Sequence, residues 1–194
     1  MSRLPALTFD QLDPDQRRLW QSITEGRRGN AASLTDQTGA LVGPFNPLLY
    51  SPVVGERVAA LGEVLRFDTS LDRRIVELAT ILVAARWRSE FEWAAHARLA
   101  ARAGVAGPVI DAIGRGEVPP LEGAVEQAVH GLVVELLDDG QVSDARYGAA
   151  RGELGEAGVV ELVALVGYYC LISFVLNAFR CPPPVGQTPP WADV

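Results

Sequence analysis

Residues 77–96 read ELATILVAARWRSEFEWAAH, and this stretch places Glu77, Glu92 and His96 in a helical region that is otherwise largely apolar. Burying an unpaired carboxylate or imidazole costs several kcal/mol, so a spacing that gathers such groups indicates a site. His96 is also one of only two histidines in the chain. The stretch therefore predicts an acid/base pocket built on two neighbouring helices.

The spacing of these residues shows how they can meet. Glu92 and His96 are four residues apart, so they share one face of a helix, with Ser89 one turn earlier on that face. Glu77 belongs to the preceding helix, and it can approach His96 if the two helices pack as a hairpin around a hinge at Arg88 and Ser89. A carboxylate beside an imidazole raises the imidazole pKa and orients the ring. Such a histidine is suited to general acid/base catalysis.

Three other interpretations of the cluster remain open. A Glu–His pair at this spacing is common on solvated helix faces, and a partly buried pair can be purely structural. One histidine with two carboxylates also resembles a facial metal triad. Because no second histidine accompanies His96, we expect no metal at the site.

Several nearby residues are candidates for substrate binding, and each also has a simpler interpretation. Arg73 could attract an anionic substrate or make a surface ion pair. Asn46 lies in a proline-rich loop, where it could bind a ligand or form an Asx-turn. Trp87 and Trp93 could wall a pocket or pack in the core. We include Ser89 in the same group because it shares the face of Glu92.

The composition favours one all-helical domain. The chain has 194 residues, of which 48% are hydrophobic, enough to build a core. Ala, Leu and Val dominate, and long stretches lack the alternation of strands. We expect residues 1–40 to form an N-terminal helix and loop, and residues 41–194 to form the helical domain, as a single globular unit.

The net charge, the cysteines and the apolar segments indicate which classes of partner and which cellular compartment to expect. The net charge of -7 lacks the basic footprint of a nucleic-acid-binding protein. Cys170 and Cys181 form neither a CxxC pair nor a metal-binding spacing. The N-terminus has no signal-peptide core, and the longest apolar run, 159–175, is short for a span of about 20 residues. We therefore expect a cytoplasmic protein with no membrane partner, in which this run is a core helix.

Helix signals divide the chain into segments. Ser70 is expected to cap the helix that carries Glu77. Three prolines within 43–52 are expected to prevent a regular helix there but still to permit short turns. The tail from Cys181 onward is expected to be non-helical and to lie across a surface or a neighbouring subunit. Helices are expected over residues 14–26, 52–66, 71–87, 89–103, 107–115, 122–138, 143–153 and 156–178.

These residues resemble the carboxymuconolactone decarboxylase and AhpD-like superfamily. Its AhpD signature is a Glu, then the first Cys of a CxxC pair twelve residues later, then a His four residues beyond the second Cys. Glu77 and His96 fit this frame, but Ser89 and Glu92 stand where the two cysteines would be. The flanking segments GPFNPLLYSPVVGERVAALGEVLRF (43–67), LDRRIVELATILVAARWRSEFEWAAH (71–96) and NAFRCPPPVGQTPP (177–190) resemble decarboxylase-like members, so the resemblance covers roughly residues 41–190.

The resemblance implies an AhpD-like bundle of orthogonally packed helices that forms a homo-oligomer, a trimer or a hexamer. It also implies a cofactor-free lyase or isomerase that applies acid/base chemistry to a small anionic lactone or enolisable carbonyl compound. His96, Glu92 and Glu77 would be catalytic. Without the dithiol we expect no thiol peroxidase activity. The alternatives are a non-catalytic ligand-binding or scaffold member, and a metal-dependent hydratase or hydrolase.

Overall fold

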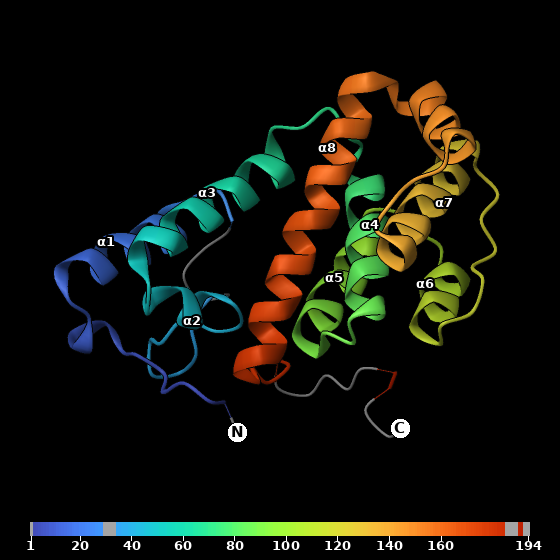
Figure 1. Ribbon diagram of the computed structural model, residues 1–194. Coiled ribbons are helices and arrows are strands. Elements are labelled where there is room, and N and C mark those ends of the chain that lie inside the picture. The colour runs from blue at the N-terminus through green and yellow to red at the C-terminus, as the bar shows by residue number, and fades with distance from the viewer. Residues whose placement is uncertain (1, 29–33, 185–189, 192–194) are drawn as a thin grey trace.

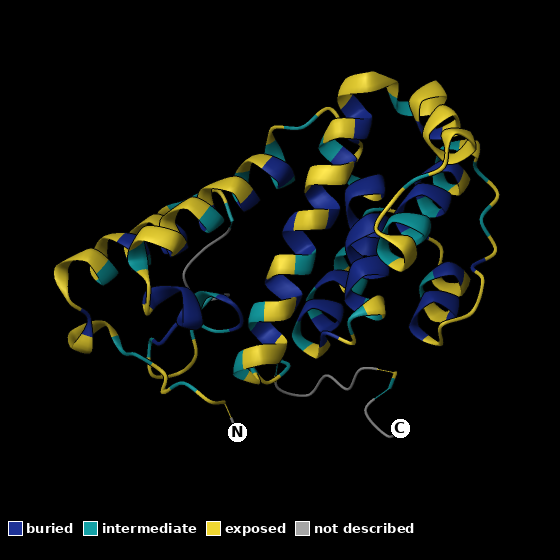
Figure 2. Ribbon diagram, in the orientation of Figure 1, coloured by how far each residue is buried: buried dark blue, intermediate teal, exposed yellow. Residues whose placement is uncertain are grey.

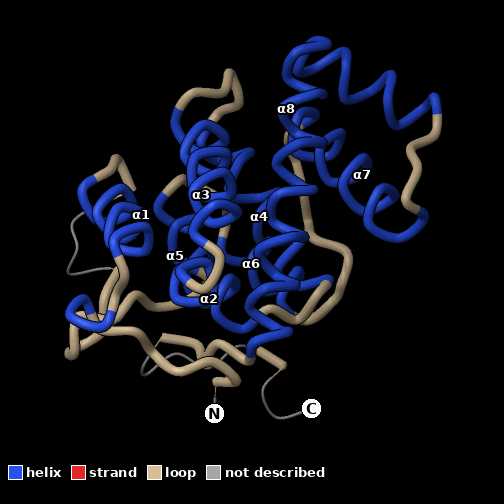
Figure 3. Tube along the Cα trace, turned by 60° about the vertical axis from the view of Figure 1, so that its left-hand side comes forward, coloured by secondary structure: helices blue, strands red, loops and turns tan. Residues whose placement is uncertain are grey.

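Eight α-helices and one 3-10 helix build the part of the chain that the computed structural model describes, residues 2–28, 34–184 and 190–191. This described part contains helices and loops without a strand (Figures 1 and 3), which confirms the all-α prediction. The elements are η1 (Phe9–Gln11), α1 (Pro14–Glu25), α2 (Phe45–Leu49), α3 (Pro52–Phe67), α4 (Arg73–Arg86), α5 (Glu90–Arg102), α6 (Gly107–Gly114), α7 (Ala124–Asp139) and α8 (Asp144–Phe179).

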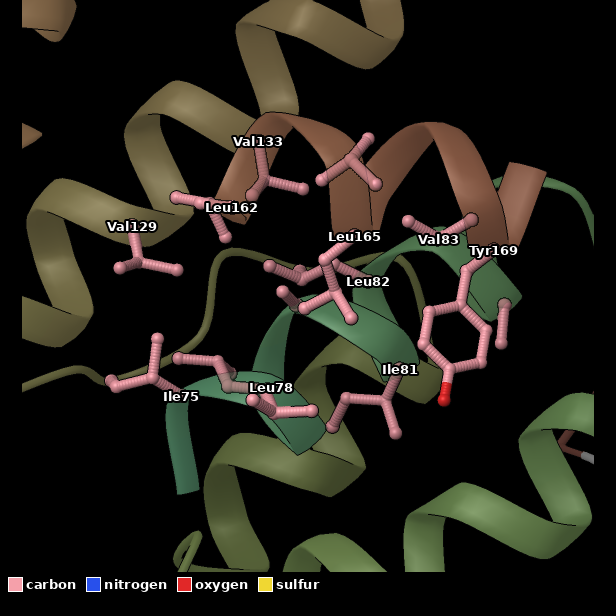
Figure 4. Packing of buried hydrophobic residues seen from close by; sticks show 14 of the residues in the cluster. Ile75, Leu78, Ile81, Leu82, Val83, Val129, Val133, Leu162, Leu165 and Tyr169 are labelled. Carbon is pink, nitrogen blue, oxygen red and sulfur yellow. The ribbon is translucent and has the colours of Figure 1, made fainter. Parts of the chain in front are cut away.

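Helix α4 is the centre of the molecule. It packs against α5, α7 and α8 and is buried along most of its length (Figure 2). Leu162 and Leu165 of α8 lie close to Leu78 and Leu82 of α4 in the core (Figure 4). Each fully buried aliphatic side chain of this kind contributes about 1.5–3 kcal/mol, so this packing fixes the position of α4.

The α4–α5 hairpin forms through specific end contacts. Asp72 caps α4, because its side chain accepts a hydrogen bond from the Arg74 backbone N–H at 2.8 Å. The expected cap, Ser70, instead donates from both its N–H and its hydroxyl to Glu161, so that prediction was wrong. At the other end the chain reverses at Arg88, which has a φ of 47°, and α5 begins one residue after Ser89.

Helix α8 combines two expected helices. Gly155 has φ 70° and ψ 175°, which interrupts the helical path where a break between residues 153 and 156 was expected. Within the described residues, α8 is the one helix long and apolar enough to cross a membrane, with a mean hydropathy of 2.2 in its most apolar window. Half of that window is buried inside the protein, as expected of a core helix.

The N-terminal elements form a smaller cluster beside this core. Leu19 of α1 packs on α3 at Gly55, where a Cβ atom would lie 2.6 Å from the Leu19 side chain. The prolines between residues 43 and 52 still permit one short helix, α2, because Pro44 precedes it and Pro47 lies in its first turn. The N-terminal arm crosses to the end of α8, where the Arg3 N–H donates to the Phe179 carbonyl at 2.9 Å.

The tail is only partly described. Residues 181–184 are not helical, in agreement with the sequence, and the Trp191 ring lies 5.1 Å from the Trp93 ring. Residues 185–189 and 192–194, which belong to the same expected extended segment, lie outside the described residues.

Candidate active site

His96 is held between two carboxylates. Its Nδ1 atom lies 2.6 Å from Oε2 of Glu77 on α4, and its Nε2 atom lies 3.1 Å from Oε1 of Glu92 on its own helix, α5. All three side chains are buried, with exposed fractions of 0% for Glu77, 4% for Glu92 and 6% for His96. The structure thus brings together the three residues that the sequence singled out.

Glu77 also has a partner on its far side. An Nη2 atom of Arg73, one turn earlier on α4, forms an ion pair with Oε1 of Glu77. Arg73 also donates to the Arg66 carbonyl at 3.1 Å, which fixes its guanidinium. When the imidazole is protonated, the charges along the row Arg73–Glu77–His96–Glu92 alternate in sign. Each buried charge then has a neighbour of opposite sign that compensates it.

The environment favours the protonated form of His96. Burial by itself lowers an imidazole pKa, but the charge of Glu92 and the hydrogen bonds to Glu77 and Glu92 outweigh it. Together they raise the pKa of His96 to about 9. His96 is therefore an imidazolium at neutral pH, with one N–H directed at each carboxylate.

The same contacts act on Glu77 in the opposite direction. Burial alone would raise the pKa of this carboxyl, yet the hydrogen bond from His96 and the charges of His96, Arg73 and Arg66 lower it. Glu77 is thus held ionised, and its role in this geometry is to orient the ring and stabilise its charge.

A cavity of about 900 Å³ opens beside this cluster. Glu92 and His96 line it, whereas Glu77 and Arg73 lie behind them and do not line it. The wall draws on the N-terminal arm, the 34–47 segment, α3, α5, α8 and the start of the tail. Its lining residues include Leu4, Arg28, Leu41, Phe45, Asn46, Arg66, Phe91, Ala95, Arg98, Tyr168, Tyr169, Ile172 and Cys181.

Two tyrosines of α8 complete the floor of the site. The Tyr169 ring meets the His96 ring edge to face at 5.1 Å, and it meets the Tyr168 ring at 5.2 Å. Burial raises the pKa of both phenols, and the charge of Glu92 adds to this effect. Both are therefore neutral at physiological pH and can donate hydrogen bonds.

The other predicted binding residues lie in different places. Asn46 lines the cavity, but its amide is used to hold the N-terminal arm: it accepts from the Leu7 N–H at 3.0 Å and donates to the Pro5 carbonyl at 2.9 Å. Ser89 is fully buried outside the lining, and its hydroxyl has no hydrogen-bond partner among the described residues. Arg73 contacts Glu77 and has no contact with the cavity.

The two tryptophans do not belong to the described lining of the cavity. Trp87 donates its indole N–H to the Cys170 sulfur at 3.2 Å and packs edge to face on Phe174. Trp93 faces α6, where a Cβ atom on Gly114 would lie 2.8 Å from its ring. Neither ring lines this cavity: Trp87 packs against α8, and Trp93 packs against α6 and Trp191.

Sequence reasoning missed the residues that come from outside the α4–α5 hairpin. Arg28 and Arg66 line the cavity, as do Tyr168, Tyr169 and the arm residue Leu4. The adjacent tyrosines inside an apolar run were the one available signal, since a buried phenol usually has a polar partner. Among the described residues no group of three His, Cys, Asp or Glu side chains is arranged to hold a metal ion.

The architecture is that of the AhpD-like helical proteins. The chain superposes with a TM-score of 0.72 on the AhpD core of an uncharacterized peroxidase-related protein from Ralstonia eutropha JMP134, at 17% identity, covering 95% of this chain and 93% of that one. An uncharacterized peroxidase-related protein from Silicibacter sp. TM1040 gives 0.72 at 12% identity, covering 96% and 95%. The debrominase Bmp8, in complex with 2,3,4-tribromopyrrole, gives 0.71 at 10% identity, covering 95% of each chain.

Comparison with family models gives one match to part of the chain. Residues 52–135 match the model of the carboxymuconolactone decarboxylase family. The matched segment runs from the start of α3 into α7 and carries Glu77, Glu92 and His96, and the match agrees with the resemblance seen in the sequence. No curated protein sequence matches the chain.

Proposed function

We propose that this protein is a cofactor-free lyase or isomerase of the carboxymuconolactone decarboxylase type. It would use acid/base chemistry on a small anionic lactone or enolisable carbonyl compound. The observation that carries the proposal is the contact of both His96 ring nitrogens with buried carboxylates, those of Glu77 and Glu92, with Glu92 at the wall of a largely apolar cavity. Buried acid/base groups that share a proton beside a cavity can exchange that proton with a carbon atom of a bound substrate.

Glu92 is assigned the contact with the substrate. Both nitrogens of His96 are already engaged by carboxylates, so the ring supplies or receives its proton through Glu92. In an isomerisation, Glu92 takes the proton next to the carbonyl, the C–H electron pair forms the enolate, and the proton returns at another carbon. In a decarboxylation, the C–C bond to the carboxylate breaks, its electron pair enters the conjugated carbonyl, CO₂ leaves and the carbon receives the proton of His96 through Glu92.

Glu77 acts through His96 as a positioning residue. It fixes the ring by its 2.6 Å contact at Nδ1 and maintains the imidazolium charge. Arg73 in turn holds Glu77. The Tyr169 hydroxyl of α8 is suited to stabilise an enolate oxygen, because it is a neutral donor at the cavity wall and its ring contacts that of His96.

Thiol peroxidase activity is not part of the proposal. The dithiol positions of the AhpD signature hold Ser89 and Glu92, which supply no thiolate. Burial raises the pKa of Cys170, and it raises that of Cys181 to about 11, so both thiols are protonated and weakly nucleophilic. Their positions also fall outside the α4–α5 hairpin.

Hydrogen–deuterium exchange at carbon tests the proposal whatever the final product is. Purified protein is incubated in D₂O with a panel of small keto acids and unsaturated lactone carboxylates, and proton NMR follows exchange at carbon and loss of CO₂. We expect Glu92→Gln and His96→Gln to lower the rate about 10²–10⁴-fold while the protein stays folded. Glu90→Gln, which changes an exposed carboxylate on the same helix, should retain the wild-type rate.

The rival functions give different results in the same experiment. Equal rates in wild type and both variants would refute acid/base catalysis by this cluster. Binding of a panel compound without any turnover would favour the ligand-binding or scaffold alternative. Turnover that disappears with a chelator, together with one bound metal ion per chain by elemental analysis, would favour the metal-dependent hydratase or hydrolase.

We also propose that the protein acts as a cytoplasmic homo-oligomer. Its two cysteines are free, as is usual in a reducing compartment. The outward face of the second half of α8 carries no charged exposed residue between 160 and 178, and it includes Val160, Val163, Leu171 and Phe174. Gly167 leaves open space in the middle of this face, so a helix of a second copy could approach closely.

A further inference from the structure

The described wall of the cavity carries more positive than negative charge, although the whole chain is acidic. Three arginines and His96 line it, against the carboxylates of Asp36 and Glu92. Asp36 is already satisfied by its own turn, where it accepts from the Thr38 N–H at 2.8 Å, from the Thr38 hydroxyl and from the Ala40 N–H. A cavity of this charge attracts an anion.

Arg66, at the end of α3, provides the first of these cations. Its guanidinium forms no ion pair with any described carboxylate, and its buried Nε atom has no hydrogen-bond partner among the described residues. Its charge nevertheless acts on Glu77, Tyr168 and Tyr169, which places it beside the catalytic cluster. A buried donor without a partner is costly, so a bound acceptor would complete this site.

Arg28 provides the second cation from a separate part of the chain. It follows α1 and donates an Nη2 hydrogen to the Ala59 carbonyl of α3 at 2.6 Å. Gly62 makes this position possible: a Cβ atom there would lie 2.6 Å from Nη2 of Arg28 and 2.0 Å from the Tyr168 hydroxyl. The guanidinium and the phenol therefore converge on one notch in α3.

Arg28 and Arg66 are not needed to balance the charges of the row Arg73–Glu77–His96–Glu92. Within that row, Arg73 and the protonated His96 balance Glu77 and Glu92. Arg28 and Arg66 face the cavity without a described carboxylate of their own, whereas Arg98 has another interaction. The uncompensated charge thus lies on the α3 side of the cavity, where Arg66 belongs to α3 and Arg28 donates to its Ala59 carbonyl.

We propose that Arg28 and Arg66, together with the Tyr168 hydroxyl, form the subsite that binds the carboxylate group of the substrate. The reacting carbon would then lie toward Glu92. This inference rests on the proposed function for the reaction, but the anion subsite itself is a binding claim that stands separately. Because Arg28 lies outside the family-matched residues 52–135, part of the substrate selectivity comes from the N-terminal segment.

Binding measurements test the subsite directly. Isothermal titration calorimetry compares 2-oxoglutarate, maleate and small lactone carboxylates with their methyl esters. We expect the acids to bind more tightly than the esters, and Arg66→Gln and Arg28→Gln each to weaken acid binding about 10–100-fold, as the loss of a charged hydrogen bond predicts. Arg57→Gln, an exposed arginine on the same helix as Arg66, is the matched control and should bind as wild type.

Two further variants separate this inference from the proposed reaction. Glu92→Gln should lose turnover but keep the preference for acids over esters. A wild-type protein that prefers the acids and turns over none of them would refute only the proposed function. Gly62→Ala, compared with Gly148→Ala at an open helical position, should weaken acid binding by displacing the Tyr168 hydroxyl and Arg28. Equal binding of acids and esters, or unchanged acid binding in both arginine variants, would overturn the subsite.

Discussion

Nδ1 of His96 lies 2.6 Å from Oε2 of Glu77, although nineteen residues and a helix reversal separate the two in sequence. The contact is made between α4 and α5, so it depends on the tertiary packing of the hairpin. Glu92 engages the opposite ring nitrogen from within α5. The imidazole is thereby fixed at both ends, and its charge state, rather than its mobility, is the property that the site controls.

The pKa of His96 should lie above the usual imidazole pKa, and that of His130 should lie below it. The carboxylates raise the pKa of His96 to about 9, whereas burial and the charge of Arg146 lower the pKa of His130. Proton NMR titration, with a His130→Gln variant for assignment, measures both. A His96 value near 6.5 would contradict the buried charge row.

Stability should fall in alkaline solution because of the same group. A folded-state pKa raised from 6.5 means that the stabilisation is fully present below about pH 6.5 and is lost as pH rises through about 9. The loss is on the order of 3 kcal/mol by the size of this shift. Urea unfolding at pH 6 and pH 10 measures this loss, and His96→Gln should remove most of the difference.

Glu77 has the opposite effect in acid solution. Its lowered pKa stabilises the fold at pH values above the ordinary carboxyl pKa of 4.5, and this contribution is lost as the pH falls through the lowered pKa.

Replacement of Glu77 should affect both folding and the imidazole. In Glu77→Gln the buried acceptor charge is removed, so Arg73 and His96 lose their common partner. We expect the free energy of unfolding to drop by roughly 3 kcal/mol and the pKa of His96 to decrease. Urea unfolding and the His96 NMR titration are the measurements. Glu90→Gln should change stability by less than about 0.5 kcal/mol, as surface substitutions usually do. An undiminished His96 pKa in Glu77→Gln would show that Glu92 alone sets the charge.

The sequence predicted that Glu77, Glu92 and His96 come together, because the patterns that place them are local. The i, i+4 spacing of Glu92 and His96 follows from helix geometry, and the hinge at Arg88–Ser89 implies a hairpin that returns toward Glu77. The helix limits were also close, since Pro14, Pro52 and Gly155 mark ends or breaks in the local chain. Ser70 was wrong as a cap because α4 begins only at Arg73, where Asp72 caps it, while Ser70 donates to Glu161 of α8.

The wall of the cavity could not be predicted in the same way. Arg28 and Tyr168 are 140 residues apart in numbering, and only the packing of α3 against α8 brings them to Gly62. Arg73 appeared to be the anion-binding residue from its proximity to Glu77, yet its guanidinium turns toward Glu77, away from the cavity. Side-chain direction at such positions depends on tertiary contacts that no local pattern encodes.

The break in α8 requires glycine. Gly155 has φ 70° and ψ 175°, a conformation essentially restricted to glycine, so Gly155→Ala should reduce the free energy of unfolding by about 1–3 kcal/mol. Gly152→Ala is the matched control, because it has open space for a methyl group in the same helix. Alanine there should stabilise the protein by up to about 1 kcal/mol. Thermal unfolding of the two variants should therefore shift in opposite directions, and a shift in the same direction would mean that the break tolerates a side chain.

The uncharged outer face of α8 should be the contact between copies of the chain. Leu171 and Phe174 are 41% and 50% exposed, on a helix whose other face is core, and such patches commonly mark association surfaces. We expect Leu171→Glu to convert an oligomer to a monomer, because burying the new carboxylate in an interface would carry a large desolvation penalty. Light scattering after size-exclusion chromatography measures the mass. Val118→Glu, at an 87% exposed loop position, adds the same charge elsewhere and should leave the mass unchanged. Circular dichroism of both variants confirms that any dissociation is not unfolding, and a wild-type protein that is monomeric at high concentration would disprove the assembly.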